Sequence, residues 1–496
     1  MFSLKSNISK EFWIVGGLLL AGLLVRLYHL EIPSLQLDEL KTAMRSNHSF
    51  LETLNLIRHS AFPPLYYALM NLWVGIFGNS EWALRLPSAV FSGMTVIVIY
   101  KLGRDLFNKD VGLFCALLLV FSPFAVNYAQ FAKMYALFWF LSAAAFLFFW
   151  RFLKGQGARS YKFYIIASIL CCYTMYTGYL LLIAQNVIFL ILGEKSWRRK
   201  WFRGQGIIAA FCIPWLIWFL CSRHETLSLM RPDASFDYLG FLFQSFLYII
   251  GSSQEVMARS NLTQLSFKLR LGQANCFLFV FLYAFSLMNV LTVGLKNRSF
   301  RRSLPVIDCF LLIWVLIPVC IYLMFDYFLF HVELAVRYIG FLQVPFILTA
   351  GRQINSLNSI IRKIGAAVML MIAFVSTGIY FQDNADNIQQ GWRQTAEELT
   401  RHLQGNDIIL SAIGADPFRY YFNAGQHRFY FYRQGTERKY CSLEFLSSQG
   451  ILKENDHSIF IIYKGLSAPE IKFNGFFLDY QARNGTVGLM HFERTK

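Results

Sequence analysis

Charged residues are scarce in this chain. They make up 15% of its 496 residues, and hydrophobic residues make up 56%. A soluble globular domain usually carries about 25% charged residues. The composition therefore excludes an ordinary soluble protein. Several stretches approach the ~20 apolar residues that cross a bilayer core. Each such stretch must form a helix, because no water reaches that core to satisfy the backbone.

Several common site motifs are also missing. The sequence has no P-loop and no dinucleotide-binding fingerprint. His29, His48 and His59 lack metal-ligand spacing, so no cofactor is expected and a divalent metal has no support. The nine cysteines offer no disulfide framework, because eight lie in or beside apolar runs and Cys441 stands alone. We find no internal repeat and no low-complexity tract.

The long apolar runs predict a polytopic α-helical membrane protein. The first run, residues 12–30, is too long for a removable signal peptide and lacks a small-residue cleavage site, so it reads as a retained span. The run 163–192 must fold back near Gly178. Residues 63–78 are expected to form a helix on the membrane surface, with a further span as the alternative. About eleven spans are predicted near 12–30, 82–100, 111–128, 135–153, 163–178, 179–193, 206–221, 275–295, 306–325, 338–351 and 364–381.

Charge predicts the orientation of these spans. With the N-terminus inside, the inner loops hold 19 Lys/Arg and 2 acidic residues, whereas the outer loops hold 10 of each. Positive residues resist translocation, so the N-terminus is expected inside and the C-terminus outside. The asymmetry also explains most of the net charge of +17. A nucleic-acid partner is not expected, because the basic loops are short, scattered and next to the membrane.

The composition changes near residue 382. Residues 383–496 contain 13 acidic and 13 basic residues and alternate strand-like runs with helical ones. We therefore predict a transmembrane domain over 1–382, with a first outer loop at 31–80, and a soluble α/β domain over 383–496. Within the second domain the pattern predicts helices at 395–403 and 417–423 and strands at 407–412 and 458–463.

An acidic pair, Asp38 and Glu39, follows the first span by a few residues. Carboxylates near the membrane surface are suited to general-base work, since each can take a proton from a hydroxyl. A structural role is the alternative: Asp38 would cap a short interfacial helix, and Glu39 would lie in its first turn. Spacing alone favours the structural role.

Several motifs follow one another in a characteristic order. They are FPPLYY (62–67), GNSEWALRLPSA (78–89), YKLGRDLF (100–107), SPF (122–124), YAQFAKMY (128–135), RY (337–338) and GWR (391–393). Together they resemble the bacterial branch of the protein O-mannosyltransferase family. That branch includes the lipid A aminoarabinose transferases and has the GT-C glycosyltransferase fold.

The resemblance implies roles for individual residues. In that family an acid of the first outer loop is the catalytic base, and the matching position is Asp38, with Glu39 as its neighbour. The family inverts the anomeric centre in one displacement, with a lipid phosphate as leaving group. Lys133 and Arg337, both at predicted outer span ends, are the candidates for stabilising that phosphate; the alternative for each is a side chain at a helix end that extends its charge to the membrane interface. The remaining residues expected to bind lipid phosphate or sugar are Tyr338, Arg58 and Tyr66.

Two positions depart from the family pattern. Phe131 stands where related sequences commonly carry an acid, and Phe62 stands where many carry His. The site is therefore expected to be more apolar. Trp392 and Arg393 are interpreted as docking residues of the outer domain rather than as substrate contacts.

The resemblance implies a glycosyltransferase of the bacterial inner membrane, with its site and C-terminal domain on the periplasmic side. The donor would be a polyprenyl-phosphate sugar, and the acceptor a glycan, lipid or protein. Membrane lipids surround the spans. Within the class, a transferase that modifies lipid A with an aminosugar is the alternative. From another class, a lipid or glycan transporter is the alternative, although it would be expected to place ionisable residues at mid-membrane.

Overall fold

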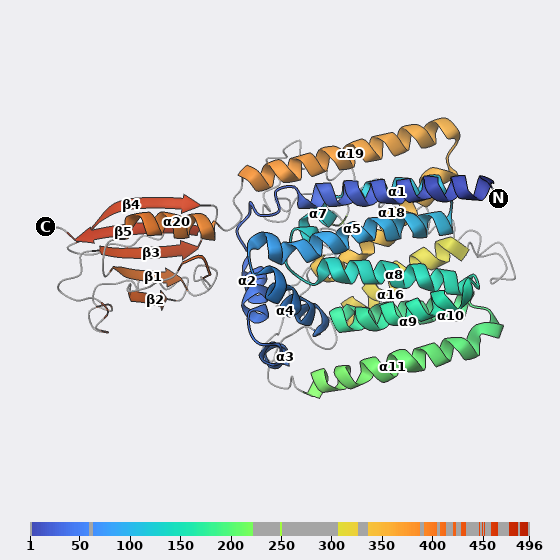
Figure 1. The fold of residues 1–496 in the computed structure, drawn as a ribbon, viewed down its shortest axis with the longest axis horizontal. Coiled ribbons are helices and arrows are strands. Elements are labelled where there is room, and N and C mark those ends of the chain that lie inside the picture. Colours follow the sequence, from blue (N-terminus) through green and yellow to red (C-terminus); the bar gives the residue numbers. More distant parts are fainter. Residues whose placement is uncertain are drawn as a thin grey trace. The chain divides into compact units, whose positions relative to one another are not determined.

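The computed structural model describes two compact units, shown in Figure 1. The helical unit contains residues 1–28, 46–78 and 83–380. The C-terminal unit contains residues 381–496 together with 29–45 and 79–82. The residues described are 2–58, 63–221, 306–325, 336–386, 391–403, 407–412, 420–422, 428–432, 458–464, 476–484 and 487–494, with single residues at 249, 446, 449 and 451.

Apolar helices build the helical unit. Most run roughly parallel to one another (Figure 1). Their bounds are α1 Phe2–Leu27, α3 Phe50–Arg58, α4 Leu65–Phe77, α5 Glu81–Leu106, α6 Lys109–Val120, α7 Pro123–Ala129, α8 Tyr135–Leu153, α9 Gly157–Thr174, α10 Thr177–Leu192, η1 Lys195–Trp197, α11 Arg198–Cys221, α16 Val306–Phe325, α17 Val336–Ile339, η4 Gly340–Leu342, α18 Gln343–Ser356 and α19 Ser359–Asp386.

These helices lie over ten of the eleven predicted spans; the span at 275–295 falls outside the described residues. By length and hydropathy, four described helices could cross a membrane: α5, α8, α16 and α19. A bent pair, α6 and α7, adds a fifth, with a bend of 59°. At the bend Ser122 caps α7 and Pro123 occupies its first turn. The number of spans and their orientation stay predictions.

The predicted turn near Gly178 is confirmed. Helix α9 ends at Thr174 and α10 begins at Thr177. A Cβ added at Gly178 would lie 2.9 Å from backbone atoms of Cys171 and Cys172. Only glycine fits so close an approach without a shift of the backbone, so this residue lets α10 fold back against α9. The helix predicted over 63–78 is also present, as α4, and its position on the membrane surface stays a prediction.

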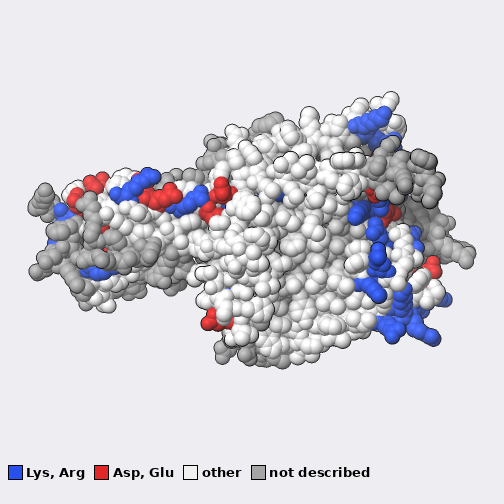
Figure 2. Space-filling view, in the orientation of Figure 1, with Lys and Arg blue, Asp and Glu red and all other residues white. Residues whose placement is uncertain are grey.

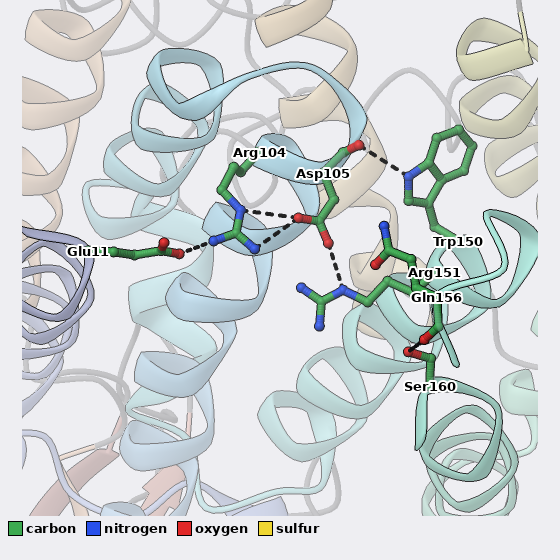
Figure 3. Close-up of polar contacts among 7 residues, drawn as sticks. All are labelled: Glu11, Arg104, Asp105, Trp150, Arg151, Gln156 and Ser160. Atoms are coloured by element: carbon green, nitrogen blue, oxygen red, sulfur yellow. Dashed lines mark hydrogen bonds and ion pairs between the residues drawn. The ribbon is translucent and has the colours of Figure 1, made fainter. Parts of the chain in front are cut away.

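Basic side chains gather at the end of the helical unit where α1 begins, while its middle is nearly free of charge (Figure 2). Figure 3 shows the polar cluster there, centred on Asp105 at the end of α5. Arg104 donates to Asp105 Oδ1 through Nε (3.1 Å) and Nη2 (3.0 Å), and Arg151 Nε donates to Oδ2 at 2.6 Å. Arg104 also pairs with Glu11 of α1. The cluster therefore joins α1, at Glu11, to the C-terminal ends of α5 and α8.

The C-terminal unit contains helices α2 (Leu37–Ser46) and α20 (Trp392–His402) and one five-stranded sheet. The strands are β1 Ile408–Ala412, β2 Arg428–Tyr432, β3 Ser458–Lys464, β4 Phe476–Asn484 and β5 Val487–Arg494, in the order β2-β1-β3-β5-β4. Strand β1 pairs in parallel with β2 and β3, whereas β5 is antiparallel to β3 and β4.

The sheet buries apolar residues on both faces. Ile408, Ile461 and Met490 belong to one cluster, and Ile409 and Phe460 belong to the other. Trp392 and Leu399 of α20 cover the second face. The predicted helix at 395–403 and strands at 407–412 and 458–463 are confirmed as α20, β1 and β3. Of the helix predicted at 417–423, residues 420 and 421 are described and are helical.

Candidate functional site

Helix α2 carries the two candidate catalytic carboxylates. The first helical hydrogen bond runs from Leu40 N to Gln36 O, so Gln36 occupies the N-cap position. Glu39 Oε2 accepts from Gln36 N at 2.9 Å, which is the back-reaching half of a capping box. The structural interpretation supposed that Asp38 caps the helix. The side chain in the cap is instead that of Glu39.

The two neighbours differ in what their carboxylates can do. Glu39 is fully buried and occupied by the cap. Asp38 is half-buried, and its carboxylate accepts no hydrogen bond from the described residues. Both stand in the first turn of α2, where the partial positive charge of the helix N-terminus favours an ionised carboxylate. Asp38 is thus the member of the pair whose oxygens are available to a substrate.

Residues 31–36, here called the strap, lead into α2 without regular structure. The C-terminal domain holds the strap with side chains. Arg393 Nη2 donates to Ile32 O at 2.8 Å, and Tyr421 Oη accepts from Leu35 N at 2.7 Å. Both contacts join residues of one compact unit. The expectation that Arg393 docks the outer domain on the transmembrane domain stays a prediction.

Lys133 lies in the turn between α7 and α8 and is 2% exposed. Its Nζ donates to Tyr67 Oη at 3.2 Å and lies 5.5 Å from the centre of the Tyr67 ring. Ser88 Oγ donates to the Lys133 carbonyl at 3.3 Å. A buried ammonium group requires polar partners, and an aromatic face adds to its stabilisation. The turn therefore holds a desolvated cation in one position.

Arg337 and Tyr338 lie in α17, just before the apolar helix α18. The guanidinium of Arg337 lies 5.3 Å from the Tyr338 ring centre, and Tyr338 contacts Tyr135 edge-on at 6.4 Å. Tyr135 follows Lys133 by two residues, so this ring contact joins Arg337 and Tyr338 to the segment of the chain that carries Lys133. A ring stack also engages Phe131, whose centre lies 6.1 Å from that of Tyr135.

The other candidates have different settings. Tyr66 is buried and contacts Tyr67 edge-on at 5.8 Å, so it packs inside the protein. Arg58 is the last residue of α3, and Phe62 lies outside the described residues. Asp38 and Glu39 belong to the C-terminal unit, whereas Lys133, Arg337, Tyr338 and Tyr66 belong to the helical unit. Among the described residues no group of three or more His, Cys, Asp or Glu could hold a metal ion.

Sequence patterns did not identify several residues that support these candidates. Tyr67 holds Lys133, while Glu81 and Tyr421 complete the contacts around Arg393. Arg26 is fully buried in α1, where it donates to Ser92 Oγ at 2.7 Å and to Leu119 O at 3.0 Å. Periodicity carries no signal for such contacts, because the partners lie far apart in the sequence.

Comparisons of the sequence with known proteins agree with the motifs. The model of the dolichyl-phosphate-mannose-protein mannosyltransferase family matches residues 61–218. YkcB of Bacillus subtilis (strain 168), a protein provisionally named a mannosyltransferase, is 25% identical over 139 residues. That alignment covers 28% of this chain and 19% of YkcB, so this chain matches about a fifth of that relative's length.

Comparisons of the structure extend the likeness to nearly the whole chain. The crystal structure of ArnT from Cupriavidus metallidurans bound to undecaprenyl phosphate matches with a TM-score of 0.56 and 13% identity, covering 96% of this chain and 97% of ArnT. An oligosaccharyltransferase from Archaeoglobus fulgidus matches with a TM-score of 0.50 and 12% identity, covering 92% of this chain and 69% of that protein. The predicted resemblance is confirmed: this chain has the fold of the GT-C glycosyltransferases, and its residues 61–218 match the mannosyltransferase family model.

Proposed function

We propose that this protein is a membrane glycosyltransferase that uses a polyprenyl-phosphate sugar and has Asp38 as its general base. The observation that carries the proposal is the contrast within the acidic pair. Glu39 is committed to the helix cap, whereas the carboxylate of Asp38 is open to a substrate. The family match over 61–218 and the fold shared with ArnT support the reaction class.

The proposed reaction is a single displacement. The oxygen of an acceptor hydroxyl attacks the anomeric carbon while Asp38 takes the hydroxyl proton. The bond between the anomeric carbon and the phosphate oxygen breaks, and the polyprenyl phosphate leaves with the bonding pair. Attack opposite the leaving group inverts the anomeric centre. The leaving phosphate gains negative charge in the transition state, so fixed cations accelerate the step.

Lys133 and Arg337 are the proposed cations. Lys133 supplies a compact charge that Tyr67 keeps in place. Arg337 supplies a planar guanidinium, whose donors suit two oxygens of one phosphate. Tyr338, Tyr66 and Arg58 are proposed to shape the donor side. The proposed setting is a bacterial inner membrane, with α2 and the C-terminal domain on the periplasmic side, where a glycan, lipid or protein hydroxyl is the acceptor.

Transfer of labelled sugar in reconstituted vesicles tests the base. Asp38→Asn keeps the volume of the side chain but removes its basicity, so transfer is expected to fall at least about 100-fold. Glu52→Gln is the matched control, because Glu52 caps an exposed helix of the same loop through Ser49. Its transfer is expected to equal that of the wild type.

The donor panel includes hexose and aminosugar polyprenyl phosphates, and the acceptor panel includes lipid A, a glycan and a peptide. Equal transfer by wild type and Asp38→Asn would remove Asp38 from catalysis. Movement of the lipid-linked sugar across the vesicle without transfer would instead favour a transporter.

A further inference from the structure

The backbone groups of the strap need hydrogen-bond partners from elsewhere in the protein. Residues 31–36 form neither helix nor strand, and only the Gln36 carbonyl takes part in the first helical hydrogen bond of α2, so the other carbonyl and amide groups cannot pair within a regular element. Ser34 and Leu35 are nevertheless fully buried. Side chains from the C-terminal domain supply partners to this segment.

Arg393, the second residue of α20, makes most of these contacts. Its Nη1 donates to Glu31 O at 3.2 Å, its Nη2 donates to Ile32 O at 2.8 Å, and its backbone N donates to Ser34 Oγ at 3.4 Å. A guanidinium presents its donors in a planar fork, so one side chain can hold two consecutive carbonyls and fix their direction. A lysine in this place would be a single point of attachment.

A buried carboxylate completes the arrangement. Glu81 has a side chain that is 10% exposed, and it pairs with Arg393 through Oε2 and accepts from the Tyr421 hydroxyl through Oε1. The same hydroxyl accepts from Leu35 N at 2.7 Å. Arg393, Glu81 and Tyr421 thus form a connected chain of contacts, here called the clamp, and its two end residues, Arg393 and Tyr421, both bind the strap.

The strap ends where α2 begins. Leu35 N is held by Tyr421, and the next amide, Gln36 N, donates to Glu39 inside the helix cap. Only Leu37 separates this cap from Asp38. Only Gln36 and Leu37 lie between Leu35 and Asp38 in the chain. A displacement of Leu35 is therefore expected to displace the Asp38 carboxylate as well. Catalytic groups tolerate little displacement, since about 1 Å can change a rate by about 100-fold.

We propose that Arg393, with Glu81 and Tyr421, is a positioning residue that fixes the strap and thereby sets the location of the Asp38 carboxylate. The inference rests on the proposed function of Asp38. It gives the C-terminal domain a defined task, which is to hold the catalytic loop rather than to provide the reacting groups. None of the three clamp residues touches the substrate in this account.

Hydrogen exchange of the purified full-length protein tests the clamp without reference to activity. In Arg393→Ala, exchange of the amides in residues 31–46 is expected to rise at least about tenfold, while β1 and β3 stay protected. Arg401→Ala is the matched control, because Arg401 lies on the same helix but pairs with Glu398, and its side chain is 70% exposed. Unchanged exchange in 31–46 would overturn the proposal. Arg393→Lys is the milder variant if Arg393→Ala does not fold.

Transfer kinetics test the positioning. Arg393→Ala is expected to lower kcat about 10- to 100-fold with the donor KM changed less than about threefold, because the base is displaced while the donor site is intact. Added guanidinium ion is expected to restore part of the lost kcat, and Arg393→Lys to retain more than Arg393→Ala. A rise in donor KM at unchanged kcat would overturn the positioning role.

The two assays separate the two hypotheses. If the wild type transfers sugar and Arg393→Ala behaves like Arg401→Ala in both assays, the positioning proposal fails and the proposed function stands. If the wild type transfers nothing but exchange rises in Arg393→Ala, the proposed function fails, and the positioning role falls with it, while the clamp remains a structural contact.

Discussion

Arg104 and Arg393 both pair with carboxylates, but they differ in what else they bind. The ion pairs of Arg104 join helices, whereas Arg393 also binds the backbone of the strap. Arg104 joins the side chains of Glu11 and Asp105, which belong to helices α1 and α5. Arg393 pairs with Glu81 and also donates to two backbone carbonyls of the strap. Within a helix most backbone groups pair with one another, so contacts between side chains can join one helix to the next. An irregular segment needs side chains for its backbone as well.

The contrast leads to different expectations for mutation. Loss of a hub that pairs several charges should affect the stability of the whole helical unit. Loss of one contact to the strap should lower the free energy of local opening of the strap. Through Asp38 it should also lower activity. Three variants test this distinction.

The largest effect is expected for Asp105→Leu. The Asp105 side chain is 9% exposed and accepts from both Arg104 and Arg151, so its removal takes away the carboxylate that Arg151 pairs with and leaves Arg104 with Glu11 alone. We expect the free energy of unfolding to fall by about 3–5 kcal/mol, the usual result of removing one partner of a buried ion pair. Chemical denaturation in detergent micelles measures it. Asp110→Asn, an exposed carboxylate in the first turn of α6, is the control, and equal stability of the two variants would contradict the role of Asp105 as a hub.

A smaller and local effect is expected for Tyr421→Phe. The variant keeps the ring but removes the hydroxyl that accepts from Leu35 N and donates to Glu81. The free energy of opening at the Leu35 amide should fall by about 1 kcal/mol, with global unfolding unchanged. Hydrogen exchange resolved at that amide provides the measurement.

Tyr420→Phe is the paired control, because the Tyr420 hydroxyl donates to Asn79 O and not to the strap. Burial, and next the charge of Glu81, raise the pKa of Tyr420 to about 12, so it stays a donor at neutral pH. If both variants open the Leu35 amide equally, the clamp is not specific to Tyr421.

The smallest effect is expected at Glu398, on the part of α20 beyond the clamp. The Tyr480 hydroxyl, and after it Arg401 and His402, lower the pKa of Glu398 below its usual 4.5. A lowered folded-state pKa stabilises the protein fully above pH 4.5, and this contribution is lost as pH falls through the folded-state pKa. The difference in unfolding temperature between wild type and Glu398→Gln should therefore shrink on acidification. Glu397→Gln, an exposed neighbour, should show no such pH dependence.

The sequence predicted the elements whose signal is local. Apolar runs located the helices, and the short apolar run 459–463 located β3. Strand β4 was missed, because Phe477, Leu478 and Gln481 are exposed and the segment has no apolar run. It lies at the edge of the sheet, paired only with β5 among the described strands.

The candidate site also has features that the sequence could predict and features that it could not. Asp38 could be singled out from its place after the first apolar run and from the family motifs. Its difference from Glu39 could not, because it depends on which of two adjacent carboxylates turns back to the Gln36 amide. The clamp could not be predicted either. Arg393 and Glu31 are separated by 362 positions, and no periodic pattern in the sequence connects them.

That separation has a consequence for biosynthesis. Arg393 is synthesised 362 residues after Glu31. At about 5–20 residues per second, roughly 20–70 s pass before the strap can meet this partner. Under the proposed function, a chain that stops before Arg393 cannot fix the segment that leads to Asp38. Such a fragment would therefore be inactive as a transferase even if its helices had entered the membrane.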